Sequence, residues 1–245
     1  MVARNMREIK LSKKCNYVHL ISGGIDSAYS LLRIAKEKKK IEPSAVIHPI
    51  FFDYGQFAAE IEWARVAKIV EYIRTFLSDQ SIVDDPLKIL LESELFQWSQ
   101  SVAFRGIRGT PDAEIENRNL VLFSVLTSYL MASANHQKIP EAEFSISSGF
   151  KEKEIADCRG DFFEGYSKLL SMYKPKLRFH FSILKDWDHL KIIRETKALL
   201  RGSETELKKF RQLTTSCYSP NINGKPCGKC IKCESLKLEK KIGHS

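Results

Sequence analysis

The residues best suited to chemistry form a short string rich in glycine and serine, Ser22–Ser27. It stands directly between an apolar run of strand length, Tyr17–Ile21, and an amphipathic helical pattern, Ile25–Lys39. A helix start offers unsatisfied backbone N–H groups and the positive end of the helix dipole, which together bind anions. Gly23 and Gly24 let the backbone approach a phosphate without a Cβ clash. The string therefore predicts a phosphate-binding loop.

The side chains of this loop extend the prediction. Ser22 and Ser27 supply hydroxyl donors, and Asp26 could hold a Mg²⁺ ion that bridges phosphate oxygens. The simpler alternative is a glycine turn with an Asp/Ser cap, but the complete string after a strand favours a phosphate loop. The G-x-x-x-x-G-K-S/T pattern is absent from the chain, so the site is not of the Walker type.

Four cysteines near the C-terminus have the spacing of metal ligands. They are Cys217, Cys227, Cys230 and Cys233, in the pattern C-x9-C-x2-C-x2-C. Two residues between cysteines let both sulfurs converge on one ion, and four thiolates fill a tetrahedral shell. A structural Zn²⁺ is therefore the first interpretation, and an iron–sulfur cluster is the alternative that the same ligands allow.

The elements that must position these residues alternate between strands and helices. Strands are expected at 17–21, 45–52, 144–148 and 178–184, with a short one inside 78–116; helices are expected at 25–39, 58–76, 120–135, 161–173 and 189–200. This order predicts an α/β fold, a parallel sheet sandwiched by helices. We expect two units, an α/β domain over 1–200 and a small zinc-binding segment over 201–245. The irregular stretch 78–116 also includes a helix and a long loop, and such loops often cover active sites.

Composition narrows the class of protein. The chain has 245 residues, 43% of them hydrophobic, and no uninterrupted apolar stretch of membrane-spanning length. Six cysteines without an export signal favour reduced thiols or metal ligands, so we expect a cytoplasmic protein. The net charge of +9 comes from residues 151–245, since residues 1–150 hold 18 basic and 18 acidic side chains. Nucleic-acid binding is the disfavoured interpretation of this charge, because it gives no reason for the phosphate loop.

The phosphate loop resembles the S-G-G-x-D-S loop of the N-type ATP pyrophosphatases, which have a Rossmann-like fold of the adenine nucleotide alpha hydrolase kind. The resemblance implies that the loop holds the pyrophosphate of ATP while AMP is transferred to a substrate oxygen. It indicates the type of reaction but not the substrate.

Other motifs are similar to those of the 7-cyano-7-deazaguanine synthase (QueC) family. The matching segments are Phe52–Gln56 (F-D-Y-G-Q), Arg118–Leu120 (R-N-L), Asp157–Arg159 (D-C-R), Thr215–Tyr218 (T-S-C-Y) and Pro226–Cys233 (P-C-G-K-C-I-K-C). The resemblance runs from about Val18 to Cys233. The family converts 7-carboxy-7-deazaguanine, ammonia and ATP into 7-cyano-7-deazaguanine, through an acyl-adenylate and an amide.

The resemblance assigns roles to particular residues. The residues expected to bind ATP and Mg²⁺ are Ser22, Gly23, Gly24, Asp26, Ser27, Asp53, Tyr54 and Gln56. Catalysis is assigned to Asp26, Ser27 and Arg118, and deazaguanine binding to Asn119, Asp157 and Arg159. The four cysteines are expected to bind zinc. For Tyr54 and Gln56 the alternative is loop packing, and for Asp157 and Arg159 it is an ordinary surface ion pair. The resemblance also implies a homodimer.

The chain departs from the family pattern on the substrate side. The family's Arg-His after D-Y-G-Q is here Phe57-Ala58, its T-D-x-S-G-Y-P run is missing before D-C-R, and a family lysine is replaced around Trp187–His189. These changes indicate a diverged member. Two further functions therefore stay open: a defence enzyme that joins the activated deazaguanine to a protein amine, and a tRNA-thiolating enzyme with an iron–sulfur cluster.

Overall fold

The computed structural model describes residues 8–91, 118–151, 159–184, 187–218, 220–221, 225–230 and 233–234. Its centre is a parallel sheet of five strands, β1 (Cys15–Leu20), β2 (Ile47–Asp53), β3 (Leu87–Leu90), β4 (Ala142–Lys151) and β5 (Leu177–Leu184). The strand order is β3-β2-β1-β4-β5. The predicted parallel α/β fold is confirmed.

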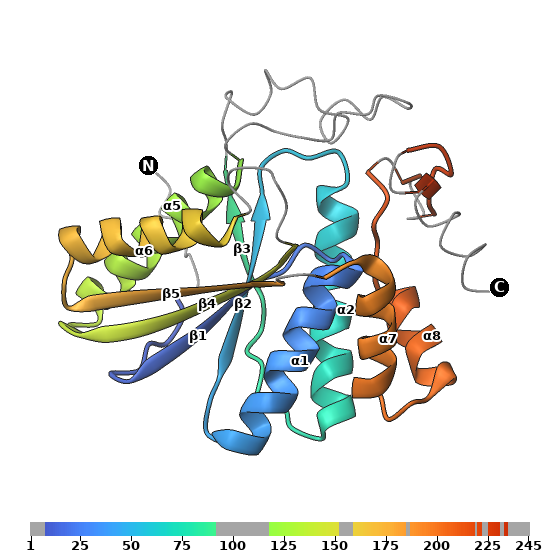
Figure 1. The fold of residues 1–245 in the computed structure, drawn as a ribbon, viewed down its shortest axis with the longest axis horizontal. Helices are drawn as coiled ribbons and strands as arrows, with labels where there is room; N and C mark the ends of the chain where they lie inside the picture. The colour runs from blue at the N-terminus through green and yellow to red at the C-terminus, as the bar shows by residue number, and fades with distance from the viewer. Residues whose placement is uncertain are drawn as a thin grey trace.

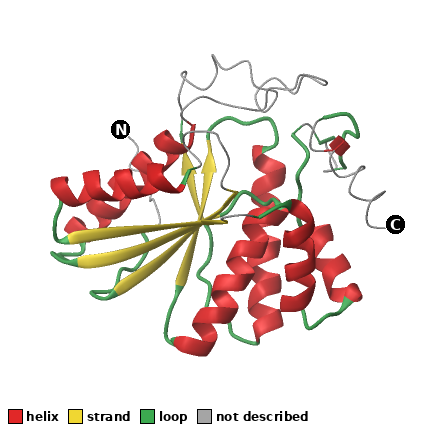
Figure 2. Cartoon of the chain, viewed as in Figure 1, coloured by secondary structure: helices red, strands yellow, loops and turns green. Residues whose placement is uncertain are grey.

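Helices cover both faces of the sheet (Figures 1 and 2). One face carries α1 (Ile25–Ile41), α2 (Ala59–Leu77), α7 (His189–Leu199) and α8 (Glu204–Leu213), and the other carries α5 (Arg118–His136) and α6 (Gly160–Tyr173). The division follows from the strand order. From β1 the chain moves outward in one direction to β2, and from β4 it moves in the other direction to β5, so right-handed crossovers place α1 and α6 on opposite faces.

The period of two along β2 supplies two separate cores. Ile47 and Phe51 belong to the core beneath α1 and α2, whereas Ile50 and Phe52 belong to the core beneath α5. Because both faces of this strand are covered, apolar residues stand at successive positions instead of alternating with polar ones. This explains the continuous apolar run of residues 50–52 in the sequence.

Helix α8 is a helix that the sequence analysis did not predict. Ser203 caps it by accepting a hydrogen bond from the backbone N–H of Glu206, at 3.2 Å. Leu207 and Phe210 join the core beneath α1 and α2, with Phe210 fully buried. Although α8 lies beyond the domain boundary expected at residue 200, its apolar side chains pack in the core of the α/β domain.

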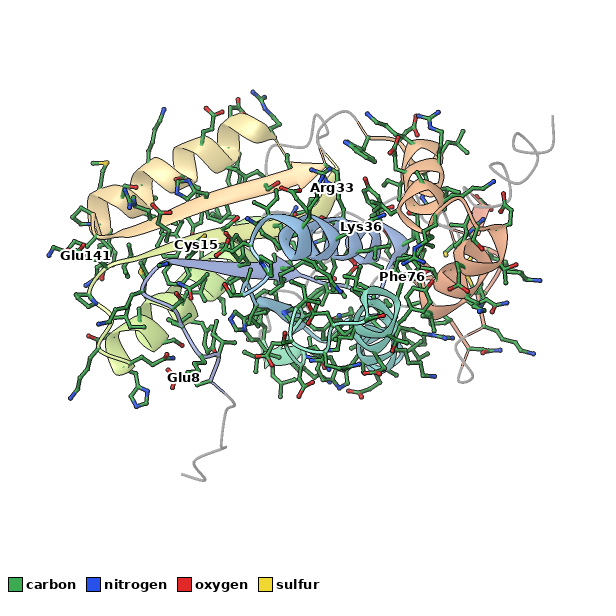
Figure 3. All side chains as sticks on the ribbon, turned by 90° about the horizontal axis from the view of Figure 1, so that it is seen from below. Glu8, Cys15, Arg33, Lys36, Phe76 and Glu141 are labelled. Atoms are coloured by element: carbon green, nitrogen blue, oxygen red, sulfur yellow. The ribbon has the colours of Figure 1, made fainter. Side chains whose placement is uncertain are left out.

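Side-chain contacts attach α7 and the segment before it to α1. Lys36 of α1, labelled in Figure 3, donates a hydrogen bond to the carbonyl of Leu199 at the end of α7, at 2.8 Å. The rings of Tyr29 and Trp187 lie 5.1 Å apart between centroids.

No helix in the described part of the chain has the length and hydropathy that a membrane crossing requires.

Candidate active site

The phosphate loop connects the end of β1 to the start of α1, as the sequence predicted. Gly23 has φ +75°, and a Cβ built on it would lie 2.9 Å from the carbonyl oxygen of Glu62. Glycine is thus required here both by conformation and by space. The Ser27 hydroxyl donates to the carbonyl of Gly24 and accepts from the N–H of Ser22, so it closes the loop on itself.

Two contacts hold the first turn of α1 against the sheet. A Cβ built on Gly149 of β4 would lie 2.3 Å from the backbone nitrogen of Ser27, so only glycine allows this approach. His19 of β1, fully buried, bonds the Ser27 carbonyl through Nε2 at 2.9 Å and the Ser147 hydroxyl through Nδ1 at 2.8 Å. Because a carbonyl only accepts, Nε2 carries the proton and Nδ1 accepts from the hydroxyl. Burial lowers the pKa of His19 to about 4, so the ring is neutral.

The loop after β2 is shaped by its own side chains. Gln56, which is buried, accepts from the N–H of Tyr54 and donates to the carbonyl of Phe52, at 2.9 and 3.1 Å. Asp53 accepts from the N–H of Gly55 and pairs with Lys88 at 2.8 Å. Asp53 and Gln56 therefore hold the turn, and the Tyr54 ring is the side chain that this turn presents to the crevice.

A crevice opens at the carboxyl ends of β1, β2 and β4, where open α/β sheets bind ligands. Its lining includes Ser22, Gly24, Asp26, Ser27, Tyr54, Gln56, Glu62, Arg118, Gly149, Phe150, Thr215, Ser216 and Tyr218. The phosphate loop, the turn after β2, the start of α5 and the segment after α8 thus share one cavity. Among the described residues predicted to bind ATP or substrate, Gly23, Asp53, Asn119 and Arg159 lie outside its lining.

Glu62 and Arg118 are oppositely charged residues that line the crevice. Burial raises the pKa of Glu62 to about 7, while a hydrogen bond from the Gln56 amide and the charge of Arg118 offset part of the rise. Burial also raises the pKa of Tyr54 and of Tyr218, and Arg118 lowers both. Arg118 is therefore the cation that stabilises negative charge in this cavity, as expected for a residue facing an anionic reactant.

Asn119 is buried behind Arg118. Its Oδ1 accepts a hydrogen bond from Nε of Arg118 at 3.3 Å. This contact orients the guanidinium, so in this structure Asn119 acts on the crevice through its neighbour.

The segment 187–189, where the sequence departs from the family, reaches the phosphate loop. Nδ1 of His189 lies 3.6 Å from Oδ1 of Asp26. Asp188 caps α7 by accepting from the N–H of Lys191 at 2.6 Å, which fixes the position of His189 in the first turn. His189, which had no predicted role, thus contacts Asp26 of the phosphate loop.

The residues before the first cluster cysteine also contact the phosphate loop. The N–H of Thr215 donates to the carbonyl of Gly23 at 2.8 Å. Thr215, Ser216 and Tyr218 line the crevice on either side of Cys217. The segment that enters the cysteine cluster is therefore also a wall of the crevice.

The four cysteines come together as predicted. Their sulfur atoms all lie within 4.8 Å of one another, with Cys217, Cys230 and Cys233 buried. Measured separations are 3.5 Å between Cys230 and Cys233 and 3.9 Å between Cys217 and Cys230. Burial opposes ionisation of Cys227, but backbone N–H groups of Lys229 and Cys230 outweigh it and lower the pKa of this thiol to about 6. The cluster can hold a metal ion.

Other predictions fall away from the crevice or outside the described residues. Arg159 pairs with Asp161 at the start of α6, and both side chains are exposed. Asp157 lies outside the described residues, as do residues 92–116 of the stretch 78–116, in which a helix and a long loop were expected. Gly149 and Glu62 were not singled out by the sequence analysis. No pattern in the neighbouring sequence marks either residue, because each is required by its contact with a segment that is distant in the sequence.

The fold and the crevice define a class: a doubly wound α/β protein with a strand–loop–helix anion site beside a four-cysteine cluster. The family model described as "Queuosine biosynthesis protein QueC" matches residues 16–238, so the chain belongs to the QueC family.

Three relatives are named 7-cyano-7-deazaguanine synthase. The protein of Prochlorococcus marinus (strain AS9601) is 27% identical over 90% of this chain and 91% of its own length. That of Leptospira interrogans (strain Fiocruz L1-130) is 28% identical over 88% and 82%, and that of Nitrosomonas europaea is 26% identical over 88% and 88%.

The buried His19 predicts a particular pH dependence of stability. Its pKa falls from 6.5 to about 4 on folding, so the contribution is complete above pH 6.5 and is lost as the pH falls toward 4. We compare the free energy of unfolding of the native protein and of His19→Gln by urea titration. The difference between them should shrink by about 3 kcal/mol from pH 7 to pH 4. A difference that does not change with pH would contradict the neutral, buried assignment.

The close approach at Gly149 predicts a large effect from a single methyl group. Gly149→Ala should lower the free energy of unfolding by about 1–3 kcal/mol, the usual cost of overpacking. Gly165→Ala is the matched control, because a Cβ there meets no atom within 4 Å and the position is helical and exposed. Equal stability of the two variants, measured by urea titration, would show that the contact is not required.

Proposed function

We propose that this protein uses ATP to adenylate the carboxylate of a 7-deazaguanine and then forms a C–N bond with ammonia, giving an amide and finally 7-cyano-7-deazaguanine. The observation that carries the proposal is the shared crevice, in which the phosphate loop at the start of α1 opens into the same cavity as Arg118. Membership of the QueC family and the names of its relatives support the choice of substrate.

In the first step the backbone N–H groups of the loop and of the first turn of α1 bind the β- and γ-phosphates. Asp26 would hold Mg²⁺, which would supply positive charge to the phosphates. An oxygen of the substrate carboxylate attacks the α-phosphorus, and pyrophosphate leaves. Arg118 stabilises the charge on the phosphoryl group in the transition state. The rigid loop supplies positioning, since Gly149 and His19 fix its first turn before ATP binds.

In the second step ammonia attacks the acyl carbon and AMP leaves, because AMP is a far better leaving group than the oxide of a free carboxylate. A second activation of the amide gives the nitrile. Tyr54 and Tyr218 offer aromatic surface in the crevice to a planar heterocycle. Binding of the heterocycle by Asp157 and Arg159 stays a prediction.

We propose zinc as the metal of the cysteine cluster. Zn–S bonds of about 2.3 Å place the sulfurs of a tetrahedral site about 3.8 Å apart. The separations of 3.5, 3.9 and 4.0 Å fit one such ion. They are short for a cluster of several iron atoms, which favours zinc over the iron–sulfur site of a tRNA-thiolating enzyme. A bound zinc would stabilise the segment that supplies Thr215 and Tyr218 to the crevice.

The direct test of the proposal is a product assay. Incubation with ATP and 7-carboxy-7-deazaguanine should yield AMP and pyrophosphate, and added ammonium should yield the amide and the nitrile by mass spectrometry. ADP as the early product would overturn the adenylation step. A deazaguanine joined by an amide bond to an added protein, in place of the nitrile, would identify a protein amine as the acceptor.

The role of Asp26 can be tested with an isosteric change. Asp26→Asn should lower turnover by roughly 100-fold or more, the scale of losing one stabiliser of a charged transition state. Asp85→Asn is the control, since its exposed ion pair with Arg74 lies outside the crevice. Native turnover in Asp26→Asn would remove Asp26 from the site.

The metal assignment predicts one zinc per chain by elemental analysis. Cys230→Ser should lose the metal and unfold at lower temperature, because metal binding contributes to folding. Cys15→Ser is the control, since that cysteine is half-buried and lies at the start of β1, outside the cluster. Iron with acid-labile sulfide, or a metal-free Cys230→Ser with full stability, would overturn the assignment.

A further inference from the structure

Glu62 is fixed between the phosphate loop and Arg118. Its backbone carbonyl lies where a Cβ on Gly23 would come within 2.9 Å, so the first turn of α2 packs directly on the loop. Its carboxylate accepts a hydrogen bond from Nε2 of Gln56 at 3.0 Å. Because the other end of the Gln56 amide is held by the N–H of Tyr54, the amide cannot turn away. The carboxylate is therefore held in one place on the wall of the crevice.

Only two carboxylates line the crevice among the described residues, Asp26 and Glu62. Asp26 belongs to the phosphate loop and contacts His189. Glu62 interacts electrostatically with Arg118 and Tyr54, and neither ATP binding nor adenylate formation, as proposed above, gives its carboxylate a role. The reaction also needs a proton acceptor, since an amine that attacks an acyl carbon must lose a proton to become an amide.

We propose that Glu62 is the general base of C–N bond formation, an inference that rests on the proposed function. The nitrogen lone pair of ammonia forms a bond to the acyl carbon of the adenylate. One proton moves from that nitrogen to the Glu62 carboxylate. The bond between the acyl carbon and the AMP oxygen breaks, and its electron pair leaves on AMP. The products are the amide, AMP and protonated Glu62, which returns its proton to solvent.

The surroundings of Glu62 suit this exchange. Burial raises its pKa to about 7, the Gln56 hydrogen bond and Arg118 lower it, and the charge of Asp53 raises it further. The other titratable groups facing it are the phenols of Tyr54 and Tyr218, both kept neutral by raised pKa values. A base whose pKa lies near the working pH is available to accept a proton and also strong enough to take one.

The test separates adenylation from amination. Exchange of labelled pyrophosphate into ATP, dependent on 7-carboxy-7-deazaguanine, reports adenylation. Formation of the amide from ammonium reports amination. Glu62→Gln should leave the exchange near the native rate and slow amide formation by roughly 100- to 10,000-fold, the usual contribution of a general base. At a fixed concentration of free ammonia, the rise of the native amination rate through pH 7 should disappear in the variant.

Three comparisons guard against a structural explanation. Glu60→Gln lies two residues away in the same helix turn, is exposed and pairs with Lys88, and it should change neither rate. If Glu62→Gln is less well folded by circular dichroism, Glu62→Asp serves instead, with slower amination and a retained pH inflection. Hydroxylamine, a stronger nucleophile that is neutral at pH 7, should still give the hydroxamate with Glu62→Gln.

The outcomes are distinguishable. Normal exchange with unchanged amide formation in Glu62→Gln would overturn the inference alone. A raised KM for the deazaguanine with an unchanged pH profile would assign Glu62 to binding and would also overturn it. Absence of exchange in the native protein would overturn the proposed function, and this inference with it.

Discussion

The contact between β4 and the first turn of α1 sets the geometry of the crevice. At Gly149 the strand approaches the backbone of Ser27 so closely that a methyl group has no room, and the buried His19 ties the same residue to β1. Both contacts act on the peptide groups that face the cavity. The backbone at the start of α1 is thus held in place by packing and hydrogen bonds within the protein.

A second dependence runs between distant parts of the chain. The segment before Cys217 bonds to Gly23, and Tyr218 just after that cysteine lines the crevice. The segment that enters the cysteine cluster therefore also forms one wall of the cavity. The turn after β2 forms another wall of the cavity. The polar groups of Asp53 and Gln56 bond to the turn itself and to Lys88, so the Tyr54 side chain is left to contact a ligand.

Features carried by local pattern were predictable from the sequence. The parallel α/β fold was predicted from the order of strands and helices. The loop between β1 and α1 and the cysteine cluster were predicted from spacing within a short segment, and each of these features is found where expected. Helix α8 was missed, although Ser203 and Glu206 form the S-x-x-E pattern of a capping box. Gly149, Glu62 and His189 could not be found in this way, because only the strand order and the packing of α2 and α7 bring them to the phosphate loop.

Substrate binding by Asp157 and Arg159 stays a prediction. Arg159 pairs with Asp161 on the surface, while Arg118, Tyr54 and Glu62 surround the cavity. All of these assignments depend on one claim, that the carboxylate of the substrate attacks the α-phosphorus of ATP. Oxygen-18 in that carboxylate tests it most directly. The account predicts that AMP released with ammonia carries one labelled oxygen; label that stays wholly in the deazaguanine, or appears in inorganic phosphate, would contradict it.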